Sequence, residues 1–187
     1  INLNTLIKNT IKFVKTKTRD IRLTLHLPKE KTHIKTNPTW LSQILFNLII
    51  NSSESILEKK SYKKDLKGSI DVYLKDCNDY FIVNITDNGK GIQSDNTGTI
   101  YNPYFTTKET GNGLGLSISK KLATKLGAKI KLTNSNSSST SFSIEIPKNK
   151  EKTWSRYSSL KMKNLLVNIF TGQFQINQKH QLKAVGM

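Results

Sequence analysis

The stretch Gly111-Asn112-Gly113-Leu114-Gly115-Leu116 places three glycines at alternate positions, directly before a helix-compatible segment that runs from Leu116 to Leu126. Because glycine has no Cβ, the backbone here can approach a bulky group closely. A turn that opens a helix also presents N–H groups without intrahelical partners and the positive end of the helix dipole, both of which favour phosphate. Glycines also mark ordinary loops, and more often, so the neighbouring segments must decide between a phosphate site and a plain turn.

The segment before these glycines, residues 92–112, contains few apolar residues until it reaches Pro103-Tyr104-Phe105-Thr106-Thr107-Lys108. We expect a mobile cover whose aromatic residues anchor it to the body of the domain. Thr106, Thr107 and Lys108 would then bring two hydroxyl groups and a cation close to the glycines. The alternative is a surface loop with an aromatic plug.

Two strands are predicted upstream, at residues 69–75 and 80–86, joined by Asp76-Cys77-Asn78-Asp79. In the second strand Asp87 continues the face of the alternating apolar residues, so its carboxylate takes the place of a core side chain. The following Asp87-Asn88-Gly89-Lys90-Gly91 contains Asn-Gly, a strong hairpin signal. The chain then continues into Ile92-Gln93-Ser94-Asp95-Asn96, which does not alternate as a returning strand would.

We therefore favour a binding loop over a hairpin at this position. Asp87 would accept a hydrogen bond from an exocyclic amine, and Gly89 and Gly91 would let a flat ring lie against the backbone. The hairpin remains the alternative.

A helix is predicted from about Pro38 to Lys59, with Asn37 as its N-cap and proline at its first position. Its core face consists of Leu41, Ile44, Leu45, Leu48, Ser52 and Ile56. Asn47, Asn51 and Glu54 share one narrow stripe beside that face. A single buried asparagine usually bonds nearby backbone, but two asparagines and a glutamate on one stripe favour a polar ligand or a metal.

The remaining elements follow from periodicity and from Pro and Gly positions. They are a helix at 2–16, a strand at 20–27, an extended piece at 32–36, a polar loop at 61–67, a helix at 116–126, and strands at 129–133 and 141–146 separated by the polar run 134–139. We expect a domain over residues 1–147, a linker over 148–163 and a short tail over 164–187 that is too small to fold alone.

The composition excludes several classes of protein. The net charge is +17, but the lysines are spread along the whole chain, so a basic nucleic-acid module is an alternative rather than the main prediction. Cys77 is the only cysteine, which excludes a disulfide framework within the chain. No apolar run reaches the length of a membrane span, and no secretory segment is present. Because the sequence starts at Ile1, we expect a piece of a longer protein or a processed chain.

Four stretches, in this order, resemble the asparagine box, first glycine box, phenylalanine box and second glycine box of sensor histidine kinases. They are Asn47-Leu48-Ile49-Ile50-Asn51, Asp87-Asn88-Gly89-Lys90-Gly91, Pro103-Tyr104-Phe105-Thr106-Thr107-Lys108 and Gly111-Asn112-Gly113-Leu114-Gly115-Leu116. The resemblance covers roughly residues 1–147. It implies an α+β Bergerat ATP-binding fold, which is a two-layer α/β sandwich with a mixed sheet and helices on one face.

The resemblance also implies roles for individual residues. Asn51 would ligate Mg²⁺ through its amide oxygen, Asn47 would lie beside the phosphates, and Asp87 would bind the adenine amino group with support from Thr140. Asn47, Asn51 and Lys108 would be the catalytic residues. The implied ATP-binding set is Asn47, Asn51, Asp87, Gly89, Gly91, Ile92, Thr106, Thr107, Lys108, Gly111, Gly113, Leu114, Gly115, Leu116 and Thr140.

The implied function is that of a Mg-ATP-binding catalytic domain of a two-component sensor histidine kinase. It would pass the γ-phosphoryl group to a histidine on a dimerisation domain in the same or a neighbouring chain, and a response regulator would follow. We expect a cytoplasmic location, with a parent protein that could be attached to a membrane, and no nucleic-acid partner. His26, His33 and His180 are expected to be structural or surface residues, so the acceptor histidine is not in this chain.

Two further alternatives stay open. The first is an ATP-binding signalling scaffold without transfer activity. The second is a hydrolytic ATPase of the same fold, but such relatives carry a glutamate at the position of Asn47, and an amide cannot act as a general base. The tail faintly resembles the start of a receiver domain, with Asn168 and Ile169 where paired acids are needed.

Overall fold

The computed structural model describes residues 1–148 except 19, 31, 109 and 110, and its centre is a mixed five-stranded sheet with the strand order β1-β2-β3-β5-β4. β1 is parallel to β2, and every other neighbouring pair is antiparallel. The strands are β1 Arg22–His26, β2 Ser69–Asp76, β3 Tyr80–Asp87, β4 Lys129–Asn136 and β5 Ser139–Pro147. The predicted mixed sheet is confirmed.

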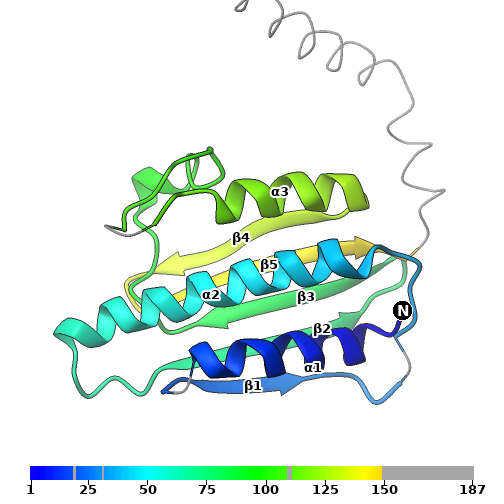
Figure 1. The fold of residues 1–187 in the computed structure, drawn as a ribbon, viewed down its shortest axis with the longest axis horizontal. Coiled ribbons are helices and arrows are strands. Elements are labelled where there is room, and N and C mark those ends of the chain that lie inside the picture. Colours follow the sequence, from blue (N-terminus) through cyan, green and yellow to red (C-terminus); the bar gives the residue numbers. More distant parts are fainter. Residues whose placement is uncertain (19, 31, 109–110, 149–187) are drawn as a thin grey trace, which may run out of the picture. The chain divides into compact units, whose positions relative to one another are not determined.

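Three α-helices cover one face of this sheet, with α1 beside β1 and β2, α2 across the middle and α3 beside β4 (Figure 1). They are α1 Leu3–Val14, α2 Pro38–Tyr62 and α3 Gly115–Leu126, with short 3₁₀ turns at Lys15–Lys17 and Ser94–Asn96. The Asn37 side chain accepts a hydrogen bond from the Trp40 N–H, so it is the N-cap that the sequence predicted. Gly127 ends α3 in the left-handed conformation with φ of 72°.

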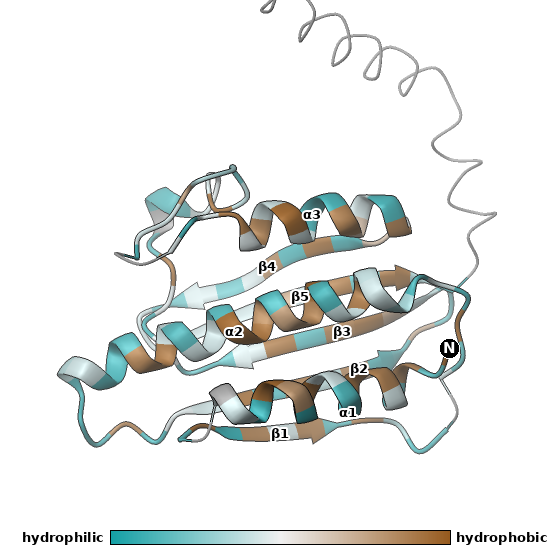
Figure 2. Cartoon of the chain, in the orientation of Figure 1, coloured by the Kyte–Doolittle hydropathy of each residue, from teal (hydrophilic) through white to brown (hydrophobic). Residues whose placement is uncertain are grey.

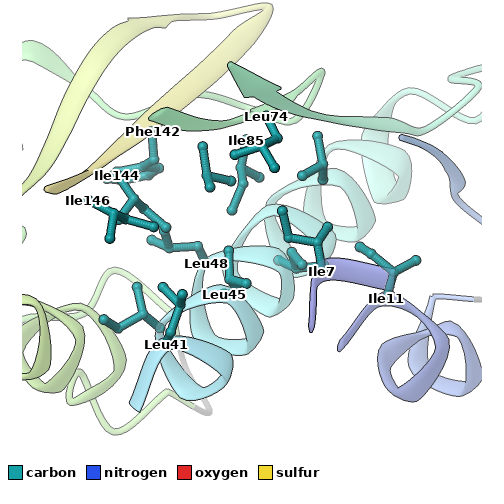
Figure 3. Close-up of a cluster of buried hydrophobic side chains, with 14 of the residues drawn as sticks. Ile7, Ile11, Leu41, Leu45, Leu48, Leu74, Ile85, Phe142, Ile144 and Ile146 are labelled. Carbon is teal, nitrogen blue, oxygen red and sulfur yellow. The ribbon is translucent and has the colours of Figure 1, made fainter. Parts of the chain in front are cut away.

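The hydrophobic core lies between the helices and the sheet (Figure 3). In this view Leu41, Leu45 and Leu48 of α2 lie on the side of the helix that faces the sheet, as do Phe142, Ile144 and Ile146 on the facing side of β5. Each fully buried leucine or isoleucine contributes about 1.5–3 kcal/mol to folding. Colouring by hydropathy shows hydrophobic (brown) and hydrophilic (teal) residues alternating along the helices and strands (Figure 2). The position of α2 over the middle of the sheet places its polar stripe next to the end of β3.

Some boundaries differ from the sequence-based predictions. α2 continues to Tyr62 rather than ending at about Lys59. β4 and β5 extend into the polar run 134–139 and meet there in a tight turn, because strand pairing uses backbone groups and does not require apolar side chains. β3 pairs only with β2 and β5 within the described residues, so no hairpin follows Asp87. The predicted linker and tail lie outside the described residues, apart from Lys148.

Candidate functional site

A cavity of about 670 Å³ opens between α2, the end of β3, the segment before α3 and the first turn of α3. This volume is within the usual range for small-molecule sites. It gathers most of the residues that the sequence predicted: Asn47, Asn51, Asp87, Gly91, Ile92, Thr106, Thr107, Lys108, Gly111, Gly113, Gly115, Leu116 and Thr140. The two predicted residues that are not among its walls are Gly89 and Leu114.

Asp87 ends β3, lines this cavity and is only 4% exposed. Its Oδ1 accepts a hydrogen bond from the Gly89 N–H at 2.9 Å, and it also hydrogen-bonds the Ser52 side chain. Thr140 lies directly opposite on β5 and is equally buried. A buried carboxylate that lines a cavity is suited to accept a hydrogen bond from a ligand.

The pKa of the Asp87 carboxyl lies close to neutral pH. Burial raises the pKa of this carboxyl from 3.8 to about 6, despite the opposing effects of its two hydrogen bonds and of the Lys59 and Lys108 charges. The group is therefore mostly ionised at neutral pH and mostly neutral in mild acid.

Gly89 and Gly91 are needed for packing of the loop after β3. A Cβ on Gly89 would lie 2.3 Å from the Ser55 hydroxyl oxygen, and one on Gly91 would lie 1.9 Å from the Asn136 carbonyl oxygen. Gly91 also has φ of 82°, which disfavours other residues. The prediction that these glycines make room for a flat ring stays untested, but close contact with α2 and β4 already requires them.

The two asparagines of the α2 stripe differ in their bonding. The Asn47 amide nitrogen donates to the Gly115 carbonyl and to the Ser119 hydroxyl, both at 3.1 Å, and its oxygen accepts from Gln43 at 2.9 Å. Asn47 therefore ties α2 to the first turn of α3. Among the described residues none hydrogen-bonds the Asn51 amide, which faces the cavity close to Gly115.

The cover over the cavity is held to α2 by an ion pair between Lys108 and Glu54. The Tyr104 N–H donates to the Gly113 carbonyl at 3.1 Å, and both residues have positive φ, 66° and 65°. A Cβ on Gly113 would lie 2.4 Å from the Tyr104 carbonyl carbon, so this glycine allows the cover to fold back on itself. In Figure 1 the green segment that precedes α3 lies beside the start of this helix.

The aromatic anchoring of the cover differs from the prediction at one residue. Phe105 packs against the core as expected. Tyr104 is 76% exposed and does not anchor the segment, because its positive φ turns the backbone toward Gly113. Tyr101 provides the second anchor instead: it packs on the core and has the Lys120 ammonium 4.8 Å from the centre of its ring.

The first residues of α3, Gly115 and Leu116, also line this cavity. The first turn of a helix leaves N–H groups without intrahelical partners, and the helix dipole adds positive charge there. No side chain caps this terminus. The Leu114 N–H is turned back to Asn112 Oδ1 at 3.2 Å. Together with Lys108, this end can bind an anion while Asp87 binds a hydrogen-bond donor.

Sequence reasoning missed two groups of the site. Lys59 is buried below the loop after β3, where its ammonium contacts three carbonyl groups. The Ser55 hydroxyl accepts a hydrogen bond from the Lys90 N–H at 3.1 Å. Nothing in the sequence separates Lys59 from the other 29 basic residues, except that it follows Ser52 and Ser55 along α2.

Residues 36–150 match the family described as histidine kinase-, DNA gyrase B- and HSP90-like ATPases. The chain is 32% identical over 150 residues to the sensor histidine kinase ZraS of Salmonella typhimurium, which covers 79% of this chain and 30% of ZraS. It is 27% identical over 152 residues to the histidine-protein kinase AtoS of Escherichia coli, covering 80% of this chain and 24% of AtoS. The chain thus spans less than a third of the length of these curated relatives.

Solved structures of histidine kinases are also similar to this chain. The catalytic domain of histidine kinase ThkA superposes with a TM-score of 0.70 at 30% identity, covering 81% of this chain and 96% of that one. A second ThkA structure, in complex with the response regulator TrrA, gives a TM-score of 0.66 at 28% identity, covering 81% of this chain and 42% of that one.

Proposed function

Because the chain belongs to the family of histidine kinase-, DNA gyrase B- and HSP90-like ATPases, we propose that it is the Mg-ATP-binding catalytic domain of a two-component sensor histidine kinase. The observation that carries this proposal is that one cavity is lined by two chemically different groups. Asp87 offers a buried acceptor, and the first turn of α3 with Lys108 offers positive charge. Adenine and a polyphosphate chain have the matching chemistry.

In this proposal the adenine amino group donates to Asp87, and Thr140, Gly91 and Ile92 form the walls beside the base. The phosphates lie against the N–H groups that open α3, with Thr106, Thr107 and Lys108 above them. Gly89 would act through the loop rather than by contact, since it lies outside the cavity wall.

The residues present fit a magnesium ion. The Asn51 amide faces the cavity without a described protein partner and supplies the hard oxygen that Mg²⁺ prefers. The described residues contain no group of three or more His, Cys, Asp or Glu side chains that could hold a metal. A magnesium ion at Asn51 would take its other ligands from phosphate oxygens and water, and when bound it would neutralise charge on the phosphates.

We propose phosphoryl transfer to a histidine rather than hydrolysis. The position where a hydrolytic relative needs a base carries Asn47, and an amide cannot remove a proton from water. The nearest carboxylate on the same stripe is Glu54, and it is ion-paired with Lys108 of the cover. The chain's own residues then position the nucleotide and stabilise charge, which is the main contribution of proteins to this reaction.

The proposed partners are a histidine-bearing dimerisation domain, in the same or a neighbouring chain, and a response regulator. The solved complex of ThkA with TrrA supports a regulator as partner for a protein of this kind. We also propose a cytoplasmic location, as expected for a domain that uses ATP. No helix among the described residues is long and apolar enough to cross a membrane.

The test is a transfer assay with ATP labelled at its γ-phosphate, a supplied histidine-bearing dimerisation domain and a parallel measurement of free phosphate. The expected result is an acid-labile, base-stable label on the partner histidine, with little free phosphate. Free phosphate without label on the partner would instead identify a hydrolytic ATPase. ATP binding with neither product would identify a scaffold.

A further inference from the structure

Lys59 is the most buried charged side chain on α2, and no role in nucleotide binding follows from its position in the sequence. It is 8% exposed. Its Nζ donates to the carbonyl oxygens of Asn88 at 3.1 Å, Gly89 at 2.9 Å and Ser137 at 3.0 Å. An ammonium group has three donors, and all three are used here. This arrangement offsets the large cost of burying a charge.

These carbonyls belong to two segments that are far apart in the chain. Asn88 and Gly89 lie in the loop after β3, and Ser137 lies in the turn between β4 and β5. The loop after β3 also lies close to the end of β4, next to this turn, since a Cβ on Gly91 would overlap the Asn136 carbonyl. The Ser135 hydroxyl makes a second connection, accepting from the Ile92 N–H at 2.7 Å and donating to the Ile92 carbonyl at 3.0 Å.

We infer that Lys59 is a positioning residue for the base-binding end of the cavity, because its ammonium group fixes the loop after β3 against the β4–β5 turn. The inference rests on the proposed function, since it assigns Lys59 a part in ATP recognition. Lys59 does not line the cavity. It acts through Gly89, whose carbonyl it binds and whose N–H donates to Asp87.

Lys59 also acts on the charge of Asp87. The charged groups that face this carboxylate are Lys59 from α2 and Lys108 from the cover, and both lower its pKa. An ionised carboxylate accepts a hydrogen bond from an amine more strongly than a neutral carboxyl does. Loss of the Lys59 charge should therefore raise the pKa of Asp87. As the pH is lowered, ATP binding should then begin to weaken at a higher pH than in the wild type.

The test compares Lys59→Met with Lys60→Met in the full chain. Methionine keeps most of the aliphatic stem and removes the ammonium group. Lys60 is the matched control, because its Nζ donates to the Asp20 carbonyl and it lies outside the cavity wall. Calorimetry would give the affinities for Mg-ATP and for inorganic tripolyphosphate at pH values below and above the Asp87 pKa.

Lys59→Met should reduce ATP affinity roughly tenfold at neutral pH and leave tripolyphosphate affinity within about twofold. The midpoint of the pH profile for ATP should move upward, and Lys60→Met should match the wild type in all three measurements. Equal losses for ATP and tripolyphosphate, or an unchanged pH midpoint, would overturn the inference.

A measurement on the wild type keeps the inference testable if Lys59→Met does not fold. In protein labelled with ¹⁵N-lysine, adenosine should shift the Lys59 Nζ resonance and tripolyphosphate should leave it in place. The opposite pattern would overturn the role of Lys59. A wild type that binds no ATP refutes the proposed function and this role with it, whereas ATP binding that is indifferent to Lys59 refutes only the role.

Discussion

The fold determines the position of Asp87, and the burial of its carboxylate nevertheless lowers the stability of that fold. The β3 burial pattern alternates without interruption from Tyr80 to Asp87, so the carboxylate occupies the last core position of the strand. Its hydrogen bonds to Gly89 and Ser52 only partly offset the loss of water, because its pKa is still raised to about 6. A carboxylate kept under these conditions is typical of a functional site rather than of a structural one.

The substitution Asp87→Asn tests the adenine role directly. Asparagine has nearly the same shape, but its amide places N–H donors where the ligand's amine must donate. We expect the ATP affinity to fall by roughly 100-fold and the tripolyphosphate affinity to stay within about twofold. Calorimetry with both ligands measures this difference. Equal weakening of the two ligands would mean that Asp87 does not contact the base.

The substitution Asn51→Ala tests the magnesium role. Because no described residue hydrogen-bonds the Asn51 amide, its removal should cost little stability while it abolishes the dependence of ATP affinity on Mg²⁺. ATP titrations with and without Mg²⁺ measure the dependence. Asn78→Ala, in the exposed turn between β2 and β3, is the control. If Mg²⁺ strengthens ATP binding equally in wild type and variant, the metal ligand lies elsewhere.

At the scale of elements, the cover is attached to α2 by an ion pair whose lysine a phosphate group would attract. Lys108 is bound to Glu54, so a phosphate that binds Lys108 would compete with this carboxylate. Exposed pairs of this kind contribute at most about 1 kcal/mol. The pair therefore holds the cover in place weakly enough for a ligand to replace it.

The substitution Glu54→Gln should consequently strengthen the binding of both ATP and tripolyphosphate by a few-fold at low salt, since it frees Lys108 and removes a negative charge near the phosphates. Glu58→Gln, which breaks the pair with Lys90 one turn later on α2, is the matched control and should have little effect. Affinities at low and high salt would measure this. Weaker binding by Glu54→Gln would indicate that Glu54 itself holds the metal.

The elements that could be predicted from the sequence are those with a strong period. The core face of α2 and the alternation of β3 determined where Asn51 and Asp87 would lie. The extensions of β4 and β5 could not be predicted, because their polar side chains carry no periodic signal although the backbone pairs normally. The packing roles of Gly89 and Gly91, and the contacts of Lys59, depend on Ser55, Asn136 and Ser137, which are distant in sequence.

For the whole molecule, the Asp87 carboxylate occupies a core position between the helices and the sheet, so its role in binding lowers the stability of the fold. The pKa of Asp87 is higher in the folded protein than its ordinary value of 3.8. The folded state therefore binds this proton more tightly than the unfolded state does. The contribution of this bound proton to the stability of the fold is fully present below about pH 3.8, and it is lost as the pH rises through about 6.

This linkage predicts that Asp87→Asn stabilises the protein without nucleotide, and more so at high pH. A pKa raised by about 2 corresponds to about 3 kcal/mol at pH 7.5 and to roughly half of that at pH 5. Thermal unfolding should show a Tm higher by about 5 to 10 °C at the higher pH, and a smaller gain at the lower one. Asp65→Asn, at an exposed position of the loop before β2, should change Tm little at either pH.

If Asp87→Asn lowers Tm at high pH, the hydrogen bonds from Ser52 and Gly89 outweigh desolvation. The carboxylate would then be a structural support as well as a base-binding group. If it raises Tm while ATP affinity falls, the burial that weakens the fold is the same burial that makes Asp87 selective for the base.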